Sequence, residues 1–302
     1  MDNPRRSVER ILPFMRVIDS HVHLYPPEVN RDPAGWAGAH GEAHWAHLCT
    51  RRRADGRAVQ AFPSVDALLR TLDADGIDRA VLLGWYWERH DTAVAQNRFL
   101  AATVRRHPDR LSALAALAPQ AGAPALTELR RAREDGLIGV GELNPYAVGL
   151  DAASPALADV LDLAGDLGLP VNLHVTDPAS ATFPGRVETP LAAIEAMVRR
   201  HPRTRFVLAH WAGGLDVRNL SNVWVDTAAA PLIYRRPVWS WLGERARPEQ
   251  VLFGSDHPLV LYPKRSDAGG PGPFVAEAVE ALPDAAVRAA VLGGNARHVF
   301  GV

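Results

Sequence analysis

The stretch VIDSHVHLYPP, residues 17–27, places two histidines two positions apart at the end of an apolar run. Successive side chains of a β-strand point to opposite faces, so Asp19, His21 and His23 share one face. The two prolines that follow cannot continue a central strand, so the strand is expected to end just after His23. Two imidazoles at a strand end suit a divalent metal, although a lone pair is more often an ordinary surface or core feature.

Seven further apolar runs of strand length follow, and segments of helical periodicity separate them. Each run is almost continuously apolar, as expected of parallel strands that are buried on both faces. A typical helical segment, SVDALLRTLDADGID, opens with Ser64 as N-cap and closes at Gly76. Eight strands alternating with helices predict an α/β fold, a closed (β/α)₈ TIM barrel, with an open doubly wound sheet as the alternative. The predicted strands are 16–24, 79–85, 111–117, 137–143, 170–175, 205–210, 222–228 and 250–256.

Residues 25–63 interrupt this alternation as a long insertion between the first strand and its helix. Insertions of this length are usually lids or disordered segments, so residues 1–302 are predicted to form one domain with a lid at 25–63. The RRR at 51–53 is expected to be a solvated loop rather than a binding patch. The lid also contains histidines that we expect to stay away from any metal, and two tryptophans: His40, His44, His47, Trp36 and Trp45.

The composition limits the partners of the protein. Its 302 residues carry a formal net charge of -1 and a pI near 6.9, so no global basic field would recruit nucleic acid or an anionic membrane. The N-terminus has no apolar stretch long enough for a signal peptide, and no run reaches the length of a membrane span. The single cysteine, Cys49, fits a reducing compartment. We therefore expect a cytoplasmic protein that acts on a small molecule.

Five of the predicted strands end in metal-binding residue types. Active sites of such barrels gather at the carboxyl ends of the strands. One such residue is often just buried and hydrogen-bonded, whereas a buried cluster needs mutual pairing or a cation. Imidazoles with carboxylates suit Zn²⁺ best, with Mn²⁺ or Fe²⁺ as alternatives. The predicted ligands, for one or two metals in each chain, are His21, His23, Glu142, His174, His210 and Asp256.

These motifs, in this order, resemble the amidohydrolase superfamily. VIDSHVHL is similar to its first-strand His-x-His signature, and NLHV, LAHWAGG and LFGSDHP resemble its strands five, six and eight. The C-terminal GGNARHVFGV resembles the amidohydrolase-related branch, which includes the aminocarboxymuconate semialdehyde decarboxylase-like enzymes. The resemblance runs from about residue 16 to the end. It implies a divalent metal at His21, His23, His174 and Asp256, with His210 as a catalytic histidine or a ligand to a second metal.

Glu142 departs from that branch. Its decarboxylases typically hold one metal and need no acid on strand four. GVGELNPY instead resembles the strand-four glutamate of TatD-type hydrolases, which bridges two metals. Glu142 could equally face the substrate as a hydrogen-bond acceptor or support a ligand. The residue favours hydrolysis of an amide, lactone or ester by a metal-activated water over the alternative, decarboxylation of an unsaturated or aromatic acid.

In the hydrolytic reading, Asp256 takes the proton from the attacking water, and His210 helps the metal to stabilise the developing oxyanion. In the decarboxylation alternative, Asp256 or His210 would protonate carbon. Asp19 lies deeper on the inward face of its strand. It could orient a ligand histidine or serve as a plain buried acceptor, and the sequence does not separate these roles.

The sequence defines the substrate less closely than it defines the metal ligands. Trp85 and Asn144 follow strands two and four and are expected to contact it. Trp85 and the lid tryptophans suggest an aromatic or ring substrate, or simply packing between lid and rim. Three loop cations could pair with a substrate carboxylate or remain solvated. A homodimer is also possible, because homodimers are common in the family that the chain resembles. The loop cations are Arg89, Arg186 and Lys264.

Overall fold

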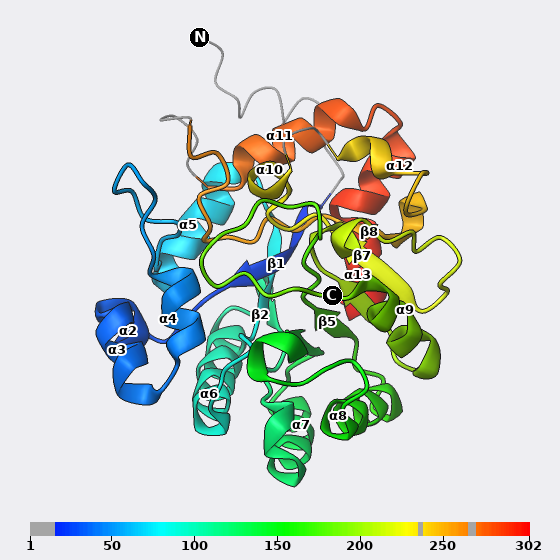
Figure 1. The fold of residues 1–302 in the computed structure, drawn as a ribbon. Coiled ribbons are helices and arrows are strands. Elements are labelled where there is room, and N and C mark those ends of the chain that lie inside the picture. The colour runs from blue at the N-terminus through cyan, green and yellow to red at the C-terminus, as the bar shows by residue number, and fades with distance from the viewer. Residues whose placement is uncertain (1–15, 235–237, 265–269) are drawn as a thin grey trace.

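A computed structural model describes residues 16–234, 238–264 and 270–302 and contains one short parallel strand within each predicted run. Figure 1 shows the strands at the centre and the helices around them. The strands are shorter than the predicted runs. Their bounds are β1 (Ile18–His23), β2 (Arg79–Leu83), β3 (Leu111–Ala113), β4 (Val140–Leu143), β5 (Val171–Leu173), β6 (Phe206–Leu208), β7 (Val223–Asp226) and β8 (Val251–Leu252).

Two bridges close the strands into a barrel. β1, β2 and β3 pair in parallel, as do the five strands from β4 to β8. A parallel bridge between Ala115 and Val140 joins β3 to β4, and another between Val22 and His257 joins the end of β8 to β1. The predicted (β/α)₈ barrel is therefore confirmed, and the open doubly wound sheet is wrong.

Helices cover the outside of the barrel where the sequence pattern placed them. In α5 (Val65–Asp75) the Ser64 hydroxyl accepts from the Ala67 amide, and Gly76 ends the helix in the left-handed conformation, with φ of 70°. The other outer helices are α6 (His90–Arg106), α7 (Ala123–Glu134), α8 (Pro155–Asp166), α9 (Leu191–Arg200), α11 (Gly272–Ala281) and α12 (Ala285–Ala289). The last helix, α13 (Asn295–Phe300), packs its Phe300 into one buried cluster with Ile18 and Leu252, so it closes the barrel.

The lid insertion has its own secondary structure and its own small core. It forms α2 (Pro27–Arg31), α3 (Pro33–His40) and α4 (Ala43–Cys49), seen beside α5 and α6 in Figure 1. An apolar cluster separate from the main core joins lid residues Tyr25 and Trp45 to Trp85 and Trp87, which follow β2. The lid is thus held on the rim by aromatic packing rather than by pairing with the barrel strands.

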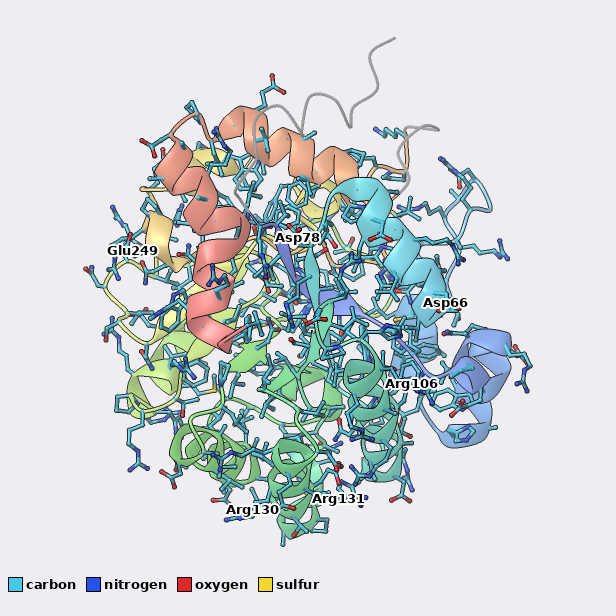
Figure 2. The ribbon with its side chains drawn as sticks, turned by 180° about the vertical axis from the view of Figure 1, so that it is seen from behind. Asp66, Asp78, Arg106, Arg130, Arg131 and Glu249 are labelled. Carbon is cyan, nitrogen blue, oxygen red and sulfur yellow. The ribbon has the colours of Figure 1, made fainter. Side chains whose placement is uncertain are left out.

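The sequence contains RRHP twice, at residues 105–108 and 199–202, and the histidine of each copy lies at the end of a helix. His201 Nδ1 lies 2.8 Å from Asp162 Oδ1 on the neighbouring α8, and the His107 amide donates to Thr103 and Val104 at the end of α6. Seen from behind, exposed positions such as Asp66, Arg106 and Arg130 show that the helical surface mixes both signs of charge (Figure 2).

Among the described residues, no helix combines the length and apolar character needed to cross a bilayer. The N-terminal stretch in which the sequence shows no signal-peptide pattern, residues 1–15, lies outside the described residues.

Candidate metal centre

His21, His23 and Glu142 form a first ligand group at one end of the barrel, and Asp256 lies beside its two histidines. His21 Nε2 and His23 Nε2 lie 3.2 Å apart. Glu142 Oε2 lies 3.9 and 3.5 Å from these nitrogens, and Asp256 Oδ1 lies 3.8 and 3.6 Å from them. Four ligands around a tetrahedral zinc ion are separated by about 3.3 Å, given a Zn–N distance of about 2.0–2.1 Å. The spacing of this group therefore fits a divalent cation.

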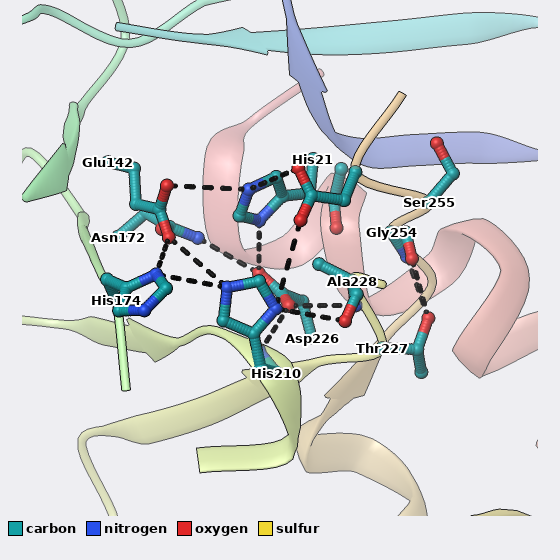
Figure 3. A network of polar contacts seen from close by, with 12 residues as sticks. His21, Glu142, Asn172, His174, His210, Asp226, Thr227, Ala228, Gly254 and Ser255 are labelled. Atoms are coloured by element: carbon teal, nitrogen blue, oxygen red, sulfur yellow. Dashed lines mark hydrogen bonds and ion pairs between the residues drawn. The ribbon is translucent and has the colours of Figure 1, made fainter. Parts of the chain in front are cut away.

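A second ligand group shares Glu142 with the first. Glu142 Oε1 lies 2.8 Å from His174 Nδ1 and 3.5 Å from His210 Nε2, and these two nitrogens are 3.1 Å apart. Figure 3 shows Glu142 between His21 on one side and the pair His174 and His210 on the other. The resemblance implied that His174 joins the first-strand histidines, whereas the structure groups it with Glu142 and His210.

The burial and charge of the two groups suit metal binding. All six side chains are buried except His174, which is half-buried. Burial opposes ionisation of Glu142, but His174 and further histidines hold its pKa well below the usual range, so the side chain is a carboxylate. Burial also disfavours a charged His210, but Glu142 and Asp256 raise its pKa to about 8. Imidazole nitrogens and carboxylate oxygens are the ligands preferred by Zn²⁺, Mn²⁺ and Fe²⁺.

Left-handed backbone conformations aim two of these residues into the site. His210 and Asp256 have φ of 58° and 67°. Such a conformation costs a non-glycine residue roughly 1 kcal/mol or more and persists only when its surroundings hold it. The Tyr234 hydroxyl donates to the His210 carbonyl at 2.9 Å, and the Asp256 amide donates to the His21 carbonyl at 2.9 Å. The LAHWAGG and LFGSDHP segments therefore turn sharply at the strand ends rather than extending the sheet.

Asp226, which was not assigned to the site from the sequence, is a buried residue that contacts both groups. Its carboxylate accepts from His21 Nδ1 at 2.9 Å and from the His210 amide at 3.0 Å. Its place at the end of β7 was the available signal, but its partners are far away in sequence. Asp19 has a different role, because its oxygens accept from the Ser255 amide and hydroxyl at 2.9 and 2.5 Å. Asp19 is thus the plain buried acceptor of the two alternatives, and burial raises its pKa to about 6.

A cavity of about 250 Å³ adjoins the ligand groups and is mainly apolar in its lining. The predicted Trp85 and Asn144 both line it, and so does Tyr86, which the sequence analysis missed. The Trp85 and Tyr86 rings stack with centroids 4.3 Å apart, and Trp85 meets His23 edge-on at 5.0 Å. Apolar side chains from the lid and from the loops after β5, β7 and β8 complete the wall: Leu48, Phe183, Val187, Leu232, Ile233 and Leu259.

The lid contributes two arginines to this cavity, so the prediction of a solvated RRR was wrong for Arg51 and Arg53. Residues 51–53 turn back and pair with the following segment, through the bridge between Arg52 and Ala58. Alternate side chains of an extended segment face opposite ways, so Arg52 is exposed while its two neighbours line the cavity. Arg53 Nη2 donates to the Val260 carbonyl at 3.1 Å, and its buried Nε has no partner within the described residues.

One of the three loop cations reaches the cavity, and the lid histidines stay outside the ligand groups of the described residues. Arg186 lines the cavity and pairs with Glu188, whereas the lining residues identified in the described part of the chain do not include Arg89 or Lys264. None of the lid histidines belongs to a ligand group within the described residues. His44 Nε2 instead donates to the Gly185 carbonyl at 3.1 Å, which ties the lid to the loop after β5.

A comparison with protein-family models finds that residues 18–302 match the amidohydrolase model Amidohydro_2. The chain belongs to this amidohydrolase family. No curated protein matches the sequence of this amidohydrolase. Its donor set fits the divalent metals that enzymes of the family use, so the protein is a metal-dependent enzyme.

Solved structures share the fold of this amidohydrolase over nearly its whole length. 5-Carboxyvanillate decarboxylase from Sphingomonas paucimobilis is 20% identical, with a TM-score of 0.72 and coverage of 95% of this chain and 99% of that one. A probable 2-pyrone-4,6-dicarboxylic acid hydrolase from Acinetobacter baumannii is 16% identical, with a TM-score of 0.63 and coverage of 95% and 100%. Dihydroxybenzoic acid decarboxylase from Polaromonas sp. JS666, with bound manganese, is 18% identical, with a TM-score of 0.64 and coverage of 95% and 97%.

Proposed function

We propose that this amidohydrolase hydrolyses an amide, lactone or ester bond of a small molecule and that its two ligand groups hold two divalent cations, preferably Zn²⁺. The observation that carries the proposal is the position of Glu142, which presents one carboxylate oxygen to each group. A carboxylate shared by two groups of imidazoles suits a pair of cations, and two-metal sites are common in hydrolytic enzymes. A one-metal decarboxylation has no need of this acid.

Bound cations would lower the pKa of water and polarise the carbonyl of the substrate. Two residues of the chain are set for the accompanying roles. Asp256 Oδ1 faces the first-strand histidines, and its Oδ2 lies 4.0 Å from His210 Nδ1, so this carboxylate can accept the proton of the attacking water. His210 Nδ1 donates to the Ala228 carbonyl at 3.0 Å, so the lone pair of the neutral ring lies on Nε2, which favours a ligand role for this atom.

The lining of the cavity suits a substrate that is a small ring compound with an acidic group. Trp85 and Tyr86 offer aromatic surface, and Arg51 and Arg53 offer cations that can pair with a carboxylate. The named substrates of the similar structures, such as carboxyvanillate and pyrone dicarboxylic acid, are ring acids of this kind. We expect Asn144 to hydrogen-bond the substrate, because it also borders the cavity.

Decarboxylation of a ring acid is the second candidate. Two of the three similar structures described above are decarboxylases, and the arginines would suit such a substrate equally well. In that reaction Asp256 or His210 would deliver the proton to carbon while the carboxylate leaves as carbon dioxide. The two candidates differ in a product that can be measured directly.

The test combines a metal count with a substrate screen. Purified protein loaded with Zn²⁺ is analysed by mass spectrometry of the metal, and lactones, aryl esters, anilides and hydroxybenzoates are screened with detection of carbon dioxide. Two metals per chain and turnover without carbon dioxide are expected. Glu142→Gln should lose at least one of the two metals, while Glu249→Gln on the surface should lose none. One metal in wild type and variant alike, together with carbon dioxide release, would favour the second candidate.

A further inference from the structure

We propose that Asp226 is a positioning residue that fixes the ring orientation and the tautomer of His21, so that Nε2 of this histidine is the atom available to a metal. The inference rests on the proposed metal site, but it concerns a contact within the chain itself. Asp226 is fully buried at the end of β7, and His21 is fully buried on β1, on the other side of the closure between β8 and β1.

Each oxygen of Asp226 has a separate task. Oδ2 accepts from His21 Nδ1 at 2.9 Å and from Asn172 Nδ2 at 3.0 Å. Oδ1 accepts from the backbone amides of His210 at 3.0 Å and Ala228 at 3.1 Å. Figure 3 shows this carboxylate between His21 and His210, with dashed contacts to both. All four contacts come from donors, so the environment is matched to a carboxylate and not to an amide.

The contact at Oδ2 decides which ring nitrogen of His21 carries a proton. Because a carboxylate can only accept, His21 Nδ1 must be the donor. The neutral ring then has its lone pair on Nε2, which faces His23 Nε2 and Asp256 Oδ1. His23 has no equivalent support, since its buried Nδ1 has no partner within the described residues. Carboxylates that hold ligand histidines in this way raise metal affinity by about 10- to 100-fold.

A purely structural role for Asp226 would act through Oδ1, which holds the left-handed turn at His210. Asp226→Asn separates the two roles, because the new amide keeps one oxygen for the backbone amides and replaces Oδ2 with a donor. Asn172 can turn to meet that donor, because its buried Oδ1 has no partner in the described structure. His21 can meet it only by accepting at Nδ1, which places the proton on Nε2 and blocks metal binding there.

The test compares Asp226→Asn with Asp162→Asn. The control makes the same change at another carboxylate, whose Oδ1 lies 2.8 Å from His201 Nδ1; neither Asp162 nor His201 belongs to a ligand group of the described residues. Zn²⁺ affinity is measured by competition with a chelator. The Nδ1–H proton of the His21 ring is followed by NMR on protein with ¹⁵N-labelled histidine, and its signal is assigned by its loss in the His21→Gln variant. Asp226→Asn should weaken Zn²⁺ binding about 10- to 100-fold and lose the His21 Nδ1–H signal, while Asp162→Asn should change affinity less than about twofold.

Two outcomes would overturn the inference. One is wild-type protein that shows no His21 Nδ1–H proton, which needs no variant and decides the matter even if Asp226→Asn fails to fold. The other is a folded Asp226→Asn protein with unchanged affinity. Failure of the proposed function looks different, because wild-type protein would then bind no Zn²⁺ while the Nδ1–H signal of His21 remained.

Discussion

The strand ends of the barrel and the lid insertion surround the same cavity but are built differently. At the strand ends, buried hydrogen bonds fix the ligand residues, as Asp226 does for His21 and the His210 amide. The lid side is held by aromatic packing around Trp45 and by a few contacts with loops, such as the antiparallel bridge between Gln60 and Leu259. The candidate ligand residues thus belong to the hydrogen-bonded strand ends of the barrel, whereas Arg51 and Arg53 reach the cavity from the lid.

Because of this difference, the two regions should respond differently to substitution. Alterations at the strand ends should affect metal content and turnover, because they displace ligands from a preorganised position. Alterations in the lid should mainly affect substrate binding, because lid residues line the cavity without joining either ligand group of the described residues. The following changes test this division.

His174→Ala should have the largest effect. It removes one of the three side chains of the second ligand group, and we expect metal content to fall and turnover to drop by at least about 1,000-fold, the range of a lost metal contribution of several kcal/mol. Metal analysis and kinetics on the same preparation check this. The control is His47→Ala, since His47 is exposed on the lid. Turnover that survives the loss of His174 would show that the site is assigned wrongly.

Substitutions in the core of the barrel and in the lid should also differ in their effect on the free energy of global unfolding. Phe206→Ala in β6 removes a fully buried side chain of the main core and should lower the free energy of unfolding by about 3–5 kcal/mol. Trp45→Ala removes an equally buried ring from the lid cluster, so we expect local opening of residues 25–63 with a smaller change in global unfolding. Denaturant unfolding and hydrogen exchange distinguish these results. Equal losses of global stability would mean that lid and barrel unfold as one unit.

The barrel and the strand-end residues that the structure brings together could be predicted from the sequence because their signals are local. Each strand is an apolar run, and His21, His23 and Glu142 stand at the ends of such runs. The contact between Asp226 and His21 spans 205 positions and exists only once the barrel closes, so no local pattern indicates it. A buried aspartate at the end of a strand was visible, but its partner was not.

The lid was harder to predict for a different reason. Its helices are short, and the hydrophobic face of α3 is weakly defined, so periodicity gives little guidance. The direction of Arg51 and Arg53 depends on a turn back through Arg52 and Ala58, which pairs residues without a strand pattern. Charge alone therefore suggested a solvated loop, and backbone geometry reversed that interpretation for two of the three arginines.

Arg53→Met tests whether the lid selects acidic substrates. The change keeps the aliphatic stem but removes a cation that lines the cavity, so we expect KM for a carboxylate-bearing substrate to rise about 10- to 100-fold while kcat changes little. Arg52→Met is the matched control, because Arg52 is exposed and its guanidinium donates to the Gly56 carbonyl. A large loss of kcat with unchanged KM would place Arg53 in the reaction itself and break the division between lid and barrel.

Phe183 should show the smallest effect, at the point where the lid meets the loop after β5. Its ring is 37% exposed, lines the cavity and lies under the Arg51 guanidinium at 5.1 Å. A cation–π contact at such a site is worth about 0.5–1 kcal/mol, so Phe183→Ala should raise KM about two- to fivefold with metal content unchanged. Phe183→Leu restores apolar volume but not the aromatic face. If the leucine variant recovers the wild-type KM, the ring acts only as apolar surface; if it does not, the ring orients Arg51 toward the substrate.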